Sequence, residues 1–390
     1  MNFKDLADKN ENYIIERRRY YHQHPELSMK EVETTNSIIA DLEAMGLEVK
    51  RFDGFYGCTA DIVGEQPGKT VALRADIDAL PIKEETGLEF ASTNGCMHAC
   101  GHDCHISMLL GAAKMLSENK DKLKGTVRLI FQPSEESGRQ EGAQDVIRSG
   151  VLDDVDAIYG SHIWGDFDAP YISIESGNRM ASTAEFHVEV EGLSAHGSAP
   201  SLGVDSIVAA SAIIMNLQTY VSRNNHPLNP LVVTVGKIEG GNRWNVIAGK
   251  TSFEGTVRTF SKELLEEAPR AMQRIVENTA AFGAKATMTF EWLVIPVIND
   301  NEKLNAIAQN AVKKMYGEEA LGHLDTLMGG EDFSYYMQKV PGVFAFVGSR
   351  NPELGKTYTN HHEKYDIDES VLKRGAATYA QFAYDFLDQE

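Results

Sequence analysis

A chain of 390 residues exceeds what one hydrophobic core usually supports, so two domains are expected. The formal net charge of -20 at pH 7 argues against nucleic acid and anionic membrane surfaces as partners. Only four cysteines occur, no apolar run could span a bilayer, and the opening MNFKDLADKNENY contains no apolar signal core, so we expect a soluble cytoplasmic protein.

The first part of the chain alternates helical and strand patterns. A helix at 3–22 precedes a second helix that should end at Gly46, with Ser28 and Glu31 spaced as a capping box before it. Apolar runs predict strands at 57–63, 70–75, 126–131 and 155–159. Between the last three lie helical patterns at about 104–118 and 141–148. This alternation predicts an α/β domain with a largely buried sheet and with its chemistry on loops at the strand ends.

From about residue 180 the order of elements changes to β-α-β-β-α-β. The segments are a strand at 184–191, a helix at 204–222, strands at 231–238 and 251–259, a helix at 261–282 and a strand at 285–292. Four strands and two helices in this order form a ferredoxin-like unit. The α/β pattern then resumes with helices near 300–316 and 368–388 around a strand at 342–347. We therefore predict a discontinuous domain of 1–179 and 293–390, interrupted by an inserted domain of 180–292.

The stretch from His98 to His105, HACGHDCH, concentrates imidazole and thiol groups in eight positions. Such donors bind zinc and related transition metals, whereas a core would use plain hydrophobes, so a metal site is the first hypothesis. A second interpretation stays open, because Cys96, Cys100 and Cys104 are four residues apart and would share one face of a helix. They could then be small buried residues, since free cysteine is among the most buried types.

Polar side chains follow three of the predicted strands. Strand by strand, these are Asp76 with Asp78, Glu135 with Glu136, and His162. Each alone could be a solvated or hydrogen-bonded residue. Their convergence on one sheet edge instead predicts a site in which one carboxylate binds metal and its neighbour transfers a proton. A late loop adds His361 and His362, of which at most one would reach a given metal, because adjacent imidazoles diverge.

Nearly the whole chain is covered by sequence blocks that point to one superfamily. The blocks are RRRYYHQHPELSMKEVET, ALRADIDALPI, MHACGHDCH, FQPSEE, AHGSAP, GGNRWNVIAG, EGTVRTF, GGEDFS and HHEKYDIDE. Together they resemble the zinc-dependent amidohydrolase and exopeptidase superfamily, in the branch of hippurate hydrolase and the auxin-conjugate amidohydrolases. The implied fold is a metallopeptidase-like catalytic domain, with a central mixed sheet and flanking helices, plus a ferredoxin-like lid and dimerisation domain.

The resemblance implies two divalent metal ions per subunit, bridged by Cys100. The remaining implied ligands are His102, Glu136, His162 and His361. His361 is selected because the family's ligand histidine precedes an aromatic residue by four positions, here Tyr365. His362 is the alternative, since the proline often seen after the ligand is missing. A bridging thiolate favours zinc, and the other ligand types also accept manganese, cobalt or nickel.

Two carboxylates that do not bind metal also take roles from the resemblance. Glu135 is the implied general base that activates a metal-bridging water, and Asp76 orients a ligand. The implied activity is metal-dependent hydrolysis of the amide bond of N-acyl amino acids or related conjugates. One alternative is a dipeptidase, aminopeptidase or other peptidase of the same superfamily. Another, from a different class, is a non-catalytic protein whose HACGHDCH loop binds one structural zinc.

The inserted domain supplies the last set of implied residues, together with a homodimer or dimer-based oligomer. His196 of AHGSAP reaches across to the other subunit's site and stabilises the oxyanion. Asn245 and Arg258 hold the substrate carboxylate, for which a planar guanidinium is suited. From the residues alone, Arg258 would be an exposed charge on a strand. Gly330 and its two neighbours shape the substrate pocket.

Overall fold

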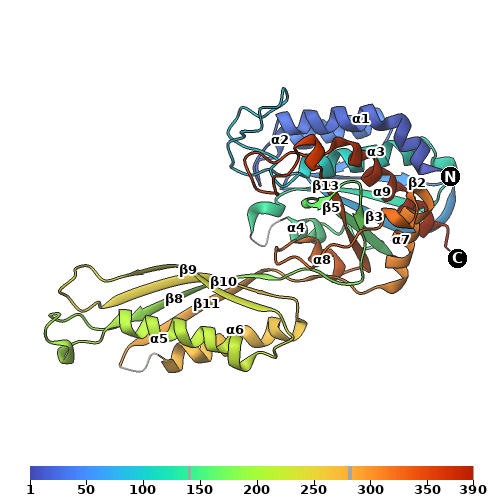
Figure 1. Ribbon diagram of the computed structural model, residues 1–390. Coiled ribbons are helices and arrows are strands. Elements are labelled where there is room, and N and C mark those ends of the chain that lie inside the picture. The colour runs from blue at the N-terminus through green and yellow to red at the C-terminus, as the bar shows by residue number, and fades with distance from the viewer. Residues whose placement is uncertain (139–141, 280–282, 390) are drawn as a thin grey trace. The chain divides into compact units, whose positions relative to one another are not determined.

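The computed structural model describes residues 1–138, 142–279 and 283–389 (Figure 1). The chain divides into two compact units. The larger unit contains Met1–Arg179, Ile298–Asp325 and Asp332–Glu390, and the smaller unit contains Met180–Val297 and Thr326–Glu331. Parts of two predicted helices, residue 141 and residues 280–282, lie outside the described residues.

The larger unit is built on a seven-stranded mixed sheet with the order β1-β2-β4-β3-β5-β13-β6. The strands are β1 (Val49–Arg51), β2 (Cys58–Val63), β3 (Gln66–Asp76), β4 (Lys124–Gln132), β5 (Ala157–Asp168), β6 (Ile172–Ser173) and β13 (Gly342–Arg350). The central strands β4, β3, β5 and β13 are parallel, and the outer strands join antiparallel. The apolar runs of these central strands are buried because helices cover the sheet. The predicted α/β class is confirmed.

Helices cover both faces of this sheet. They are α1 (Phe3–Gln23), α2 (Val32–Ala44), α3 (His102–Ser117), α4 (Ala143–Arg148), α7 (Glu302–Tyr316), α8 (Phe333–Met337) and α9 (Leu372–Leu387). In Figure 1, α1, α2 and α3 lie over one face and α4 and α8 over the other. Almost every side chain of α3 is buried, because α1 and α9 pack beside it against the sheet. Among the described helices, none combines the length and apolar character that a membrane span requires.

The smaller unit contains a four-stranded antiparallel sheet with the order β11-β8-β10-β9. Its elements are β8 (Thr183–Glu191), α5 (Ser206–Thr219), β9 (Leu231–Gly240), β10 (Lys250–Thr259), α6 (Lys262–Thr279) and β11 (Lys285–Val294). Alternate residues of β8 are buried, as its sequence predicts, because α5 and α6 cover one face of the sheet (Figure 1). The ferredoxin-like arrangement is confirmed. A separate pair, β7 (Gly177–Met180) and β12 (Val297–Asn299), forms a two-stranded sheet.

Two local predictions are wrong. The strand expected to end at 159 continues to Asp168, because β13 pairs with β5 well beyond that point, so His162 lies within the strand and not after it. The capping box before α2 does not form. Ser28 Oγ donates instead to Asp78 Oδ2 at 2.7 Å, and the Glu31 carboxylate accepts from the backbone N–H of Ser134 at 2.8 Å. Both side chains are used by partners far away in the sequence.

Candidate metal centre

The parallel strands β4, β3 and β5 are neighbours, as predicted, and they bring the strand-end side chains to one edge of the sheet. Asp76 ends β3 directly opposite Gln132 at the end of β4. Glu135 and Glu136 follow three residues later in a short 3-10 turn, Glu135–Ser137. The sheet therefore places the Asp76 carboxylate beside the turn that carries the two glutamates.

A tight turn at Gly101 delivers Cys100 and His102. Gly101 has φ of 92°, and a Cβ there would lie 2.4 Å from Ile163 Cγ2, so glycine is needed both for the backbone conformation and for space. His102 is the first residue of α3. Its Nδ1 donates to the Asp78 backbone oxygen at 2.9 Å, which leaves Nε2 buried and without a hydrogen-bond partner among the described residues. That nitrogen could therefore hold a metal ion.

Two groups of possible ligands share the Cys100 thiol. The first group is Cys100, His102 and His162; the second is Cys100, Glu136 and His361. The donor atoms within each group lie within 4.8 Å of one another. Cys100 Sγ lies 3.4 Å from His162 Nε2, and His361 Nε2 lies 3.1 Å from Glu136 Oε1. All five predicted ligands are therefore brought together, in an arrangement that suits two cations sharing one sulfur.

The two adjacent C-terminal histidines point to different surroundings. His361 has φ of 68°, its backbone N–H donates to the Ala99 oxygen at 2.8 Å, and its ring reaches Glu136. The ring of His362 instead stacks on Tyr358, with centroids 4.4 Å apart, and its Nδ1 accepts the Lys364 N–H at 3.0 Å. Of the pair, only His361 falls within a described donor group.

Asp78 holds both His102 and the turn of Glu136. Besides binding His102, it accepts the Glu136 backbone N–H through Oδ2 at 2.9 Å. Asp76 contacts His105 Nδ1 and accepts from Arg74 at 2.7 Å, while its distance to His102 Nε2 is 3.7 Å. Sequence reasoning placed Asp78 at the strand end but gave it no role, although its spacing of two residues from Asp76 was the available signal.

Asn360 is a second residue that the sequence did not single out. Its Nδ2 donates to the Cys100 oxygen at 2.8 Å and to the Ile163 oxygen at 3.2 Å, and its Oδ1 accepts the Gly165 N–H at 2.8 Å. One amide side chain thus fixes the loop before His361 to the Cys100 turn and to β5. Its position next to His361 was the only sequence signal.

The electrostatics of this cluster favour a bound cation. Burial and the charge of Glu136 raise the pKa of the Cys100 thiol well above its ordinary value. Burial lowers the pKa of His102, but Asp76 and other nearby carboxylates outweigh it and raise the value to about 10. Burial keeps the pKa of His162 well below its usual range, so this ring is neutral as a ligand must be. Divalent cations would offset the clustered negative charge and displace the protons of the thiol and of His102.

The remaining predicted residues lie in the smaller unit. His196 is exposed, and the adjacent Gly197 N–H donates to the Asn245 oxygen at 2.8 Å, so the AHGSAP and GGNRWNVIAG loops are neighbours. Asn245 Oδ1 is buried and has no hydrogen-bond partner among the described residues. Arg258 is half-buried and contacts the Thr183 hydroxyl, and a Cβ on Gly330 would lie 2.4 Å from that same hydroxyl.

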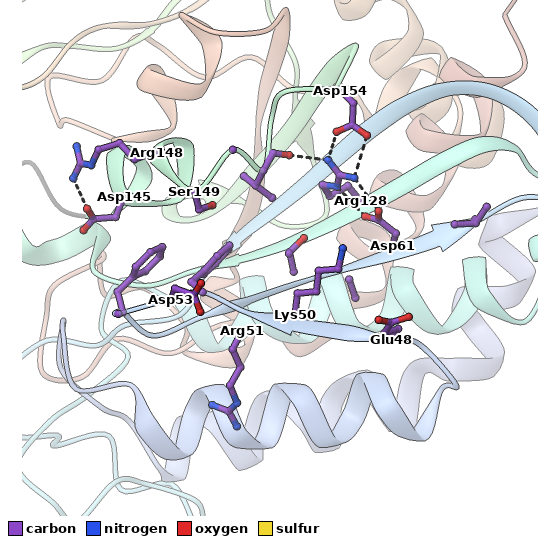
Figure 2. Close-up of a pocket in the computed structure, with 18 residues that line it drawn as sticks. Glu48, Lys50, Arg51, Asp53, Asp61, Arg128, Asp145, Arg148, Ser149 and Asp154 are labelled. Atoms are coloured by element: carbon purple, nitrogen blue, oxygen red, sulfur yellow. Dashed lines mark hydrogen bonds and ion pairs between the residues drawn. The ribbon is translucent and has the colours of Figure 1, made fainter.

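A cavity of about 1050 Å³ lies apart from these donors (Figure 2). It is lined by residues of β1 and β2 and by the segment around 145–154, and none of the five candidate ligands lines it. Figure 2 shows Arg128 bonded to Asp61 and Asp154, and Arg148 bonded to Asp145. Two of its cationic groups, Arg128 and Arg148, are thus paired with carboxylates, whereas Arg51 donates to Asn36 Oδ1 at 2.6 Å.

The fold and the shared-thiol donor set together are typical of a metal-dependent hydrolase. The chain is 42% identical over 382 residues to "N-acetyl-L-cysteine deacetylase" of Bacillus subtilis, covering 97% of this chain and 89% of that protein. It is 37% identical to "IAA-amino acid hydrolase ILR1-like 4" of Arabidopsis thaliana, covering 99% and 88%. The crystal structure of the Bacillus subtilis YXEP protein, described as a dinuclear metal-binding peptidase, matches with a TM-score of 0.86 at 36% identity, covering 98% and 100%.

Residues 72–385 match the family described as Peptidase family M20/M25/M40, and the chain belongs to this family. It is therefore an enzyme of the metallo-amidohydrolase and peptidase class, and the predicted superfamily is confirmed. The alternative of a non-catalytic structural-zinc protein is set aside.

Proposed function

We propose that this enzyme hydrolyses the amide bond of N-acyl amino acids or related conjugates, with Glu135 as the general base. The observation that carries the proposal is the pair of donor groups sharing Cys100, with the Glu135 carboxylate beside them: its oxygen, a His102 nitrogen and a Glu136 oxygen lie within 4.8 Å of one another. The names of two relatives, a deacetylase of N-acetyl-L-cysteine and a hydrolase of IAA-amino acids, support this substrate class.

The proposed ligands of two divalent cations are Cys100, His102, Glu136, His162 and His361. Their chemistry fits zinc best, because it combines a thiolate with imidazoles, and manganese, cobalt or nickel would also be accepted. When bound, such cations supply Lewis acidity, which polarises a carbonyl and makes water a better nucleophile. The buried, unpartnered Nε2 of His102 supports this assignment.

Glu135 performs the proton transfers in this proposal. It accepts a proton from the attacking water and then donates it to the leaving amine nitrogen, which must be protonated to depart. Asp78 holds the neighbouring Glu136 through its backbone N–H, so the glutamate turn has a fixed orientation. Asp76 acts indirectly, through His105. It contacts His105 Nδ1, and His105 Nε2 accepts the N–H of Ile163, the residue after the proposed ligand His162, at 2.9 Å.

Substrate recognition is assigned to the smaller unit. Among the described residues, the Arg258 guanidinium contacts the Thr183 hydroxyl and no carboxylate, and burial lowers its pKa, so a bound anion would stabilise its charged form. We assign it, with the Nδ2 amide group of Asn245 as a second donor, to the substrate carboxylate. Gly330 lies against Thr183 and Val294, so a side chain at this position would displace the Thr183 hydroxyl that Arg258 contacts. The region 180–292 would act as the lid.

The proposal includes a homodimer in which His196 of one subunit stabilises the oxyanion in the other. Strand β9 is the last strand of its sheet, so its outer edge has no neighbouring strand. Large apolar side chains are exposed nearby: Val208 and Met215 on α5 are 51% and 66% exposed, and Ile238 on β9 is 50% exposed. A second copy would cover this surface.

The experiment compares Glu135→Ala with Glu136→Ala on N-acetyl and N-benzoyl amino acids. Glu135→Ala should lower kcat by about 10²–10⁴-fold with full metal content, because a proton-transfer residue is not a ligand. Glu136→Ala should lose both activity and metal. Metal loss in Glu135→Ala alone would mean that the two roles are exchanged.

A peptidase is the second candidate, favoured by the description of the YXEP protein as a peptidase. The same centre could attack a peptide bond, since an N-acyl amino acid and a dipeptide differ mainly in a free amino group. Comparing kcat/KM for N-acetyl amino acids, dipeptides and longer peptides decides between them. A higher kcat/KM for dipeptides would overturn the N-acyl assignment and leave the metal assignment intact.

A further inference from the structure

Three non-glycine residues have positive φ among the described residues: one is the proposed ligand His361, and the other two, Met29 and Ser134, contact each other at the turn before Glu135. Met29 has φ of 63°, Ser134 of 60° and His361 of 68°. A left-handed conformation is strained for a non-glycine residue, so it persists only where the surroundings hold it. His361 is a proposed ligand, and Ser134 directly precedes the proposed base Glu135. The contacts that hold Ser134 therefore bear on the position of Glu135.

The Glu31 carboxylate makes the main contact with Ser134. Glu31 is fully buried, and its Oε1 accepts the Ser134 backbone N–H at 2.8 Å and the Ser134 hydroxyl at 3.3 Å. That hydroxyl in turn accepts the Met29 N–H at 2.9 Å. Because Ser134 is only 4% exposed, its N–H would be buried and unpaired without Glu31. Glu31, which the sequence predicted to act only in helix capping, thus supports the strained turn at Ser134.

The turn is held on both sides of Glu135. On the N-terminal side, Glu31 binds the N–H of Ser134; on the C-terminal side, Asp78 binds the N–H of Glu136 at 2.9 Å. The backbone of Glu135 lies between these two anchored groups, so loss of either anchor would let its carboxylate move. Misplacement of a catalytic group by about 1 Å can cost on the order of 10²-fold in rate.

We propose that Glu31 is a positioning residue for Glu135, acting through the left-handed backbone of Ser134. Glu31 belongs to none of the described donor groups, and its Oε1 supplies an oriented acceptor for the Ser134 N–H. The inference rests on the proposed function in one respect, namely that Glu135 is the general base. The family assignment does not by itself give Glu31 this task.

The same segment offers a matched control. Glu26 also uses a carboxylate oxygen to accept a backbone N–H, that of Thr34 at 2.8 Å, and its own backbone oxygen accepts the Ala79 N–H at 2.8 Å. Among the described residues, neither of these hydrogen bonds of Glu26 reaches the turn at Ser134. Removing the Glu26 carboxylate therefore perturbs the start of α2 without releasing Glu135. Glu31→Gln is the conservative variant, because its amide oxygen can replace Oε1 as acceptor.

The first test compares steady-state kinetics of Glu31→Ala, Glu31→Gln and Glu26→Ala in the metal-loaded enzyme. Glu31→Ala should lower kcat roughly 10- to 100-fold while KM changes by less than about threefold, because a displaced base affects the chemical step and not uniform binding. Glu31→Gln and Glu26→Ala should keep kcat within about threefold of the parent. Equal losses in Glu31→Ala and Glu26→Ala would overturn the proposal.

The second test needs no activity. Hydrogen–deuterium exchange of a peptide covering 131–138 should be faster in Glu31→Ala than in the parent, and unchanged in Glu26→Ala, because only the first frees the Ser134 amide. Unchanged exchange in Glu31→Ala would overturn the proposal whatever the kinetics. If the parent enzyme hydrolyses no amide substrate while exchange responds as expected, the proposed function fails and the anchoring of the turn by Glu31 stands.

A rescue variant separates positioning from a general loss of stability. Glycine adopts positive φ without the Cβ penalty, so Ser134→Gly should recover at least part of the kcat lost in Glu31→Ala. It should not recover a loss that arises from unfolding around α2, which melting temperatures of the single and double variants report. No recovery of kcat in a folded double variant would contradict a role through the Ser134 backbone.

Discussion

The buried guanidinium of Arg18 gives a stability prediction that can be worked from distances. Arg18 lies on α1 with a side chain only 2% exposed, and its Nε donates to Asp103 Oδ2 at 2.9 Å. The same guanidinium contacts Asp366 at 3.1 Å and Glu369 at 3.2 Å. Asp103 follows the proposed ligand His102, so one arginine ties α1 to the start of α3 and to the C-terminal loop.

Arg18→Met keeps most of the side-chain volume but removes the charge. Asp103 is 1% exposed and would be left with His22, whose Nδ1 lies 2.8 Å from it. Breaking a buried ion pair on one side costs about 3–5 kcal/mol in the free energy of unfolding. The control is Arg19→Met: Arg19 is 49% exposed and contacts the shared partner Glu369, so its loss should cost about 1 kcal/mol or less.

The direction in which the free energy of unfolding changes with pH follows from the titration of the Asp103 carboxyl. Burial raises its pKa, but the charges of Arg18 and His22 outweigh burial and hold it below the ordinary value. A carboxylate with a lowered pKa stabilises the fold above its unfolded pKa of about 3.9, and this contribution is lost as the pH falls below that value. In Arg18→Met the Arg18 charge no longer opposes the effect of burial, so the pKa of Asp103 rises and its carboxyl takes up a proton at a higher pH than in the parent. The difference between the parent and Arg18→Met should therefore be largest near pH 7 and shrink toward pH 4.

Urea unfolding followed by circular dichroism, at pH 7 and at pH 4.5 with the same metal content, measures both effects. A loss in Arg18→Met no larger than that in Arg19→Met would refute the assignment of Arg18 as a buried ion-pair centre. A difference that grows as the pH falls would refute the linkage to Asp103.

Removal of the cations by a chelator should abolish hydrolysis and lower the melting temperature, because the clustered carboxylates would lose the positive charge that offsets their repulsion. Full activity in protein shown by elemental analysis to be metal-free would contradict the proposed metal centre. Gly101→Ala should lower the amount of metal retained after dialysis about 10-fold, because alanine is strained at φ of 92° and its Cβ would lie 2.4 Å from Ile163, which would displace the flanking residues Cys100 and His102. Unchanged metal content would contradict this role of Gly101. Arg258→Lys should raise KM for N-acyl amino acids roughly 10-fold with little change in kcat, because a point charge replaces a planar fork; a loss confined to kcat would exclude carboxylate binding. A mixture of His196→Ala and Glu135→Ala subunits should regain about a quarter of the parent activity, because half of the randomly paired dimers are heterodimers and each heterodimer has one complete site out of two. Verified heterodimers without activity would rule out a shared site.

The fold was predictable because its signals are local. Buried runs such as β3 and the alternating residues of β8 report which faces are covered, and the order of elements then selects a ferredoxin-like unit. Strand ends were less predictable. Nothing near Tyr159 indicates that β5 continues, because its extension depends on pairing with β13, which lies about 180 residues further along the chain.

The candidate site, like the fold, could be predicted from the sequence only in part. Residue types and strand ends indicated a metal centre, and the family resemblance selected Cys100 among several thiols and His361 from a pair of imidazoles. The supporting residues were not accessible to such reasoning. Asp78, Asn360 and Glu31 act through hydrogen bonds to backbone groups far away in the sequence, and a common polar residue carries no local mark of such a partner.

The donor set is spread over much of the chain, and this affects how the protein is made. Cys100 and His361 are separated by about 260 residues, so a ribosome adding about 5–20 residues per second needs roughly 10–50 s between them. During that interval the nascent chain carries thiol and imidazole groups that no partner has yet enclosed. We expect correct metal loading only after release of the finished polypeptide. Metal content would then serve as a measure of complete, correctly folded product in any expression host.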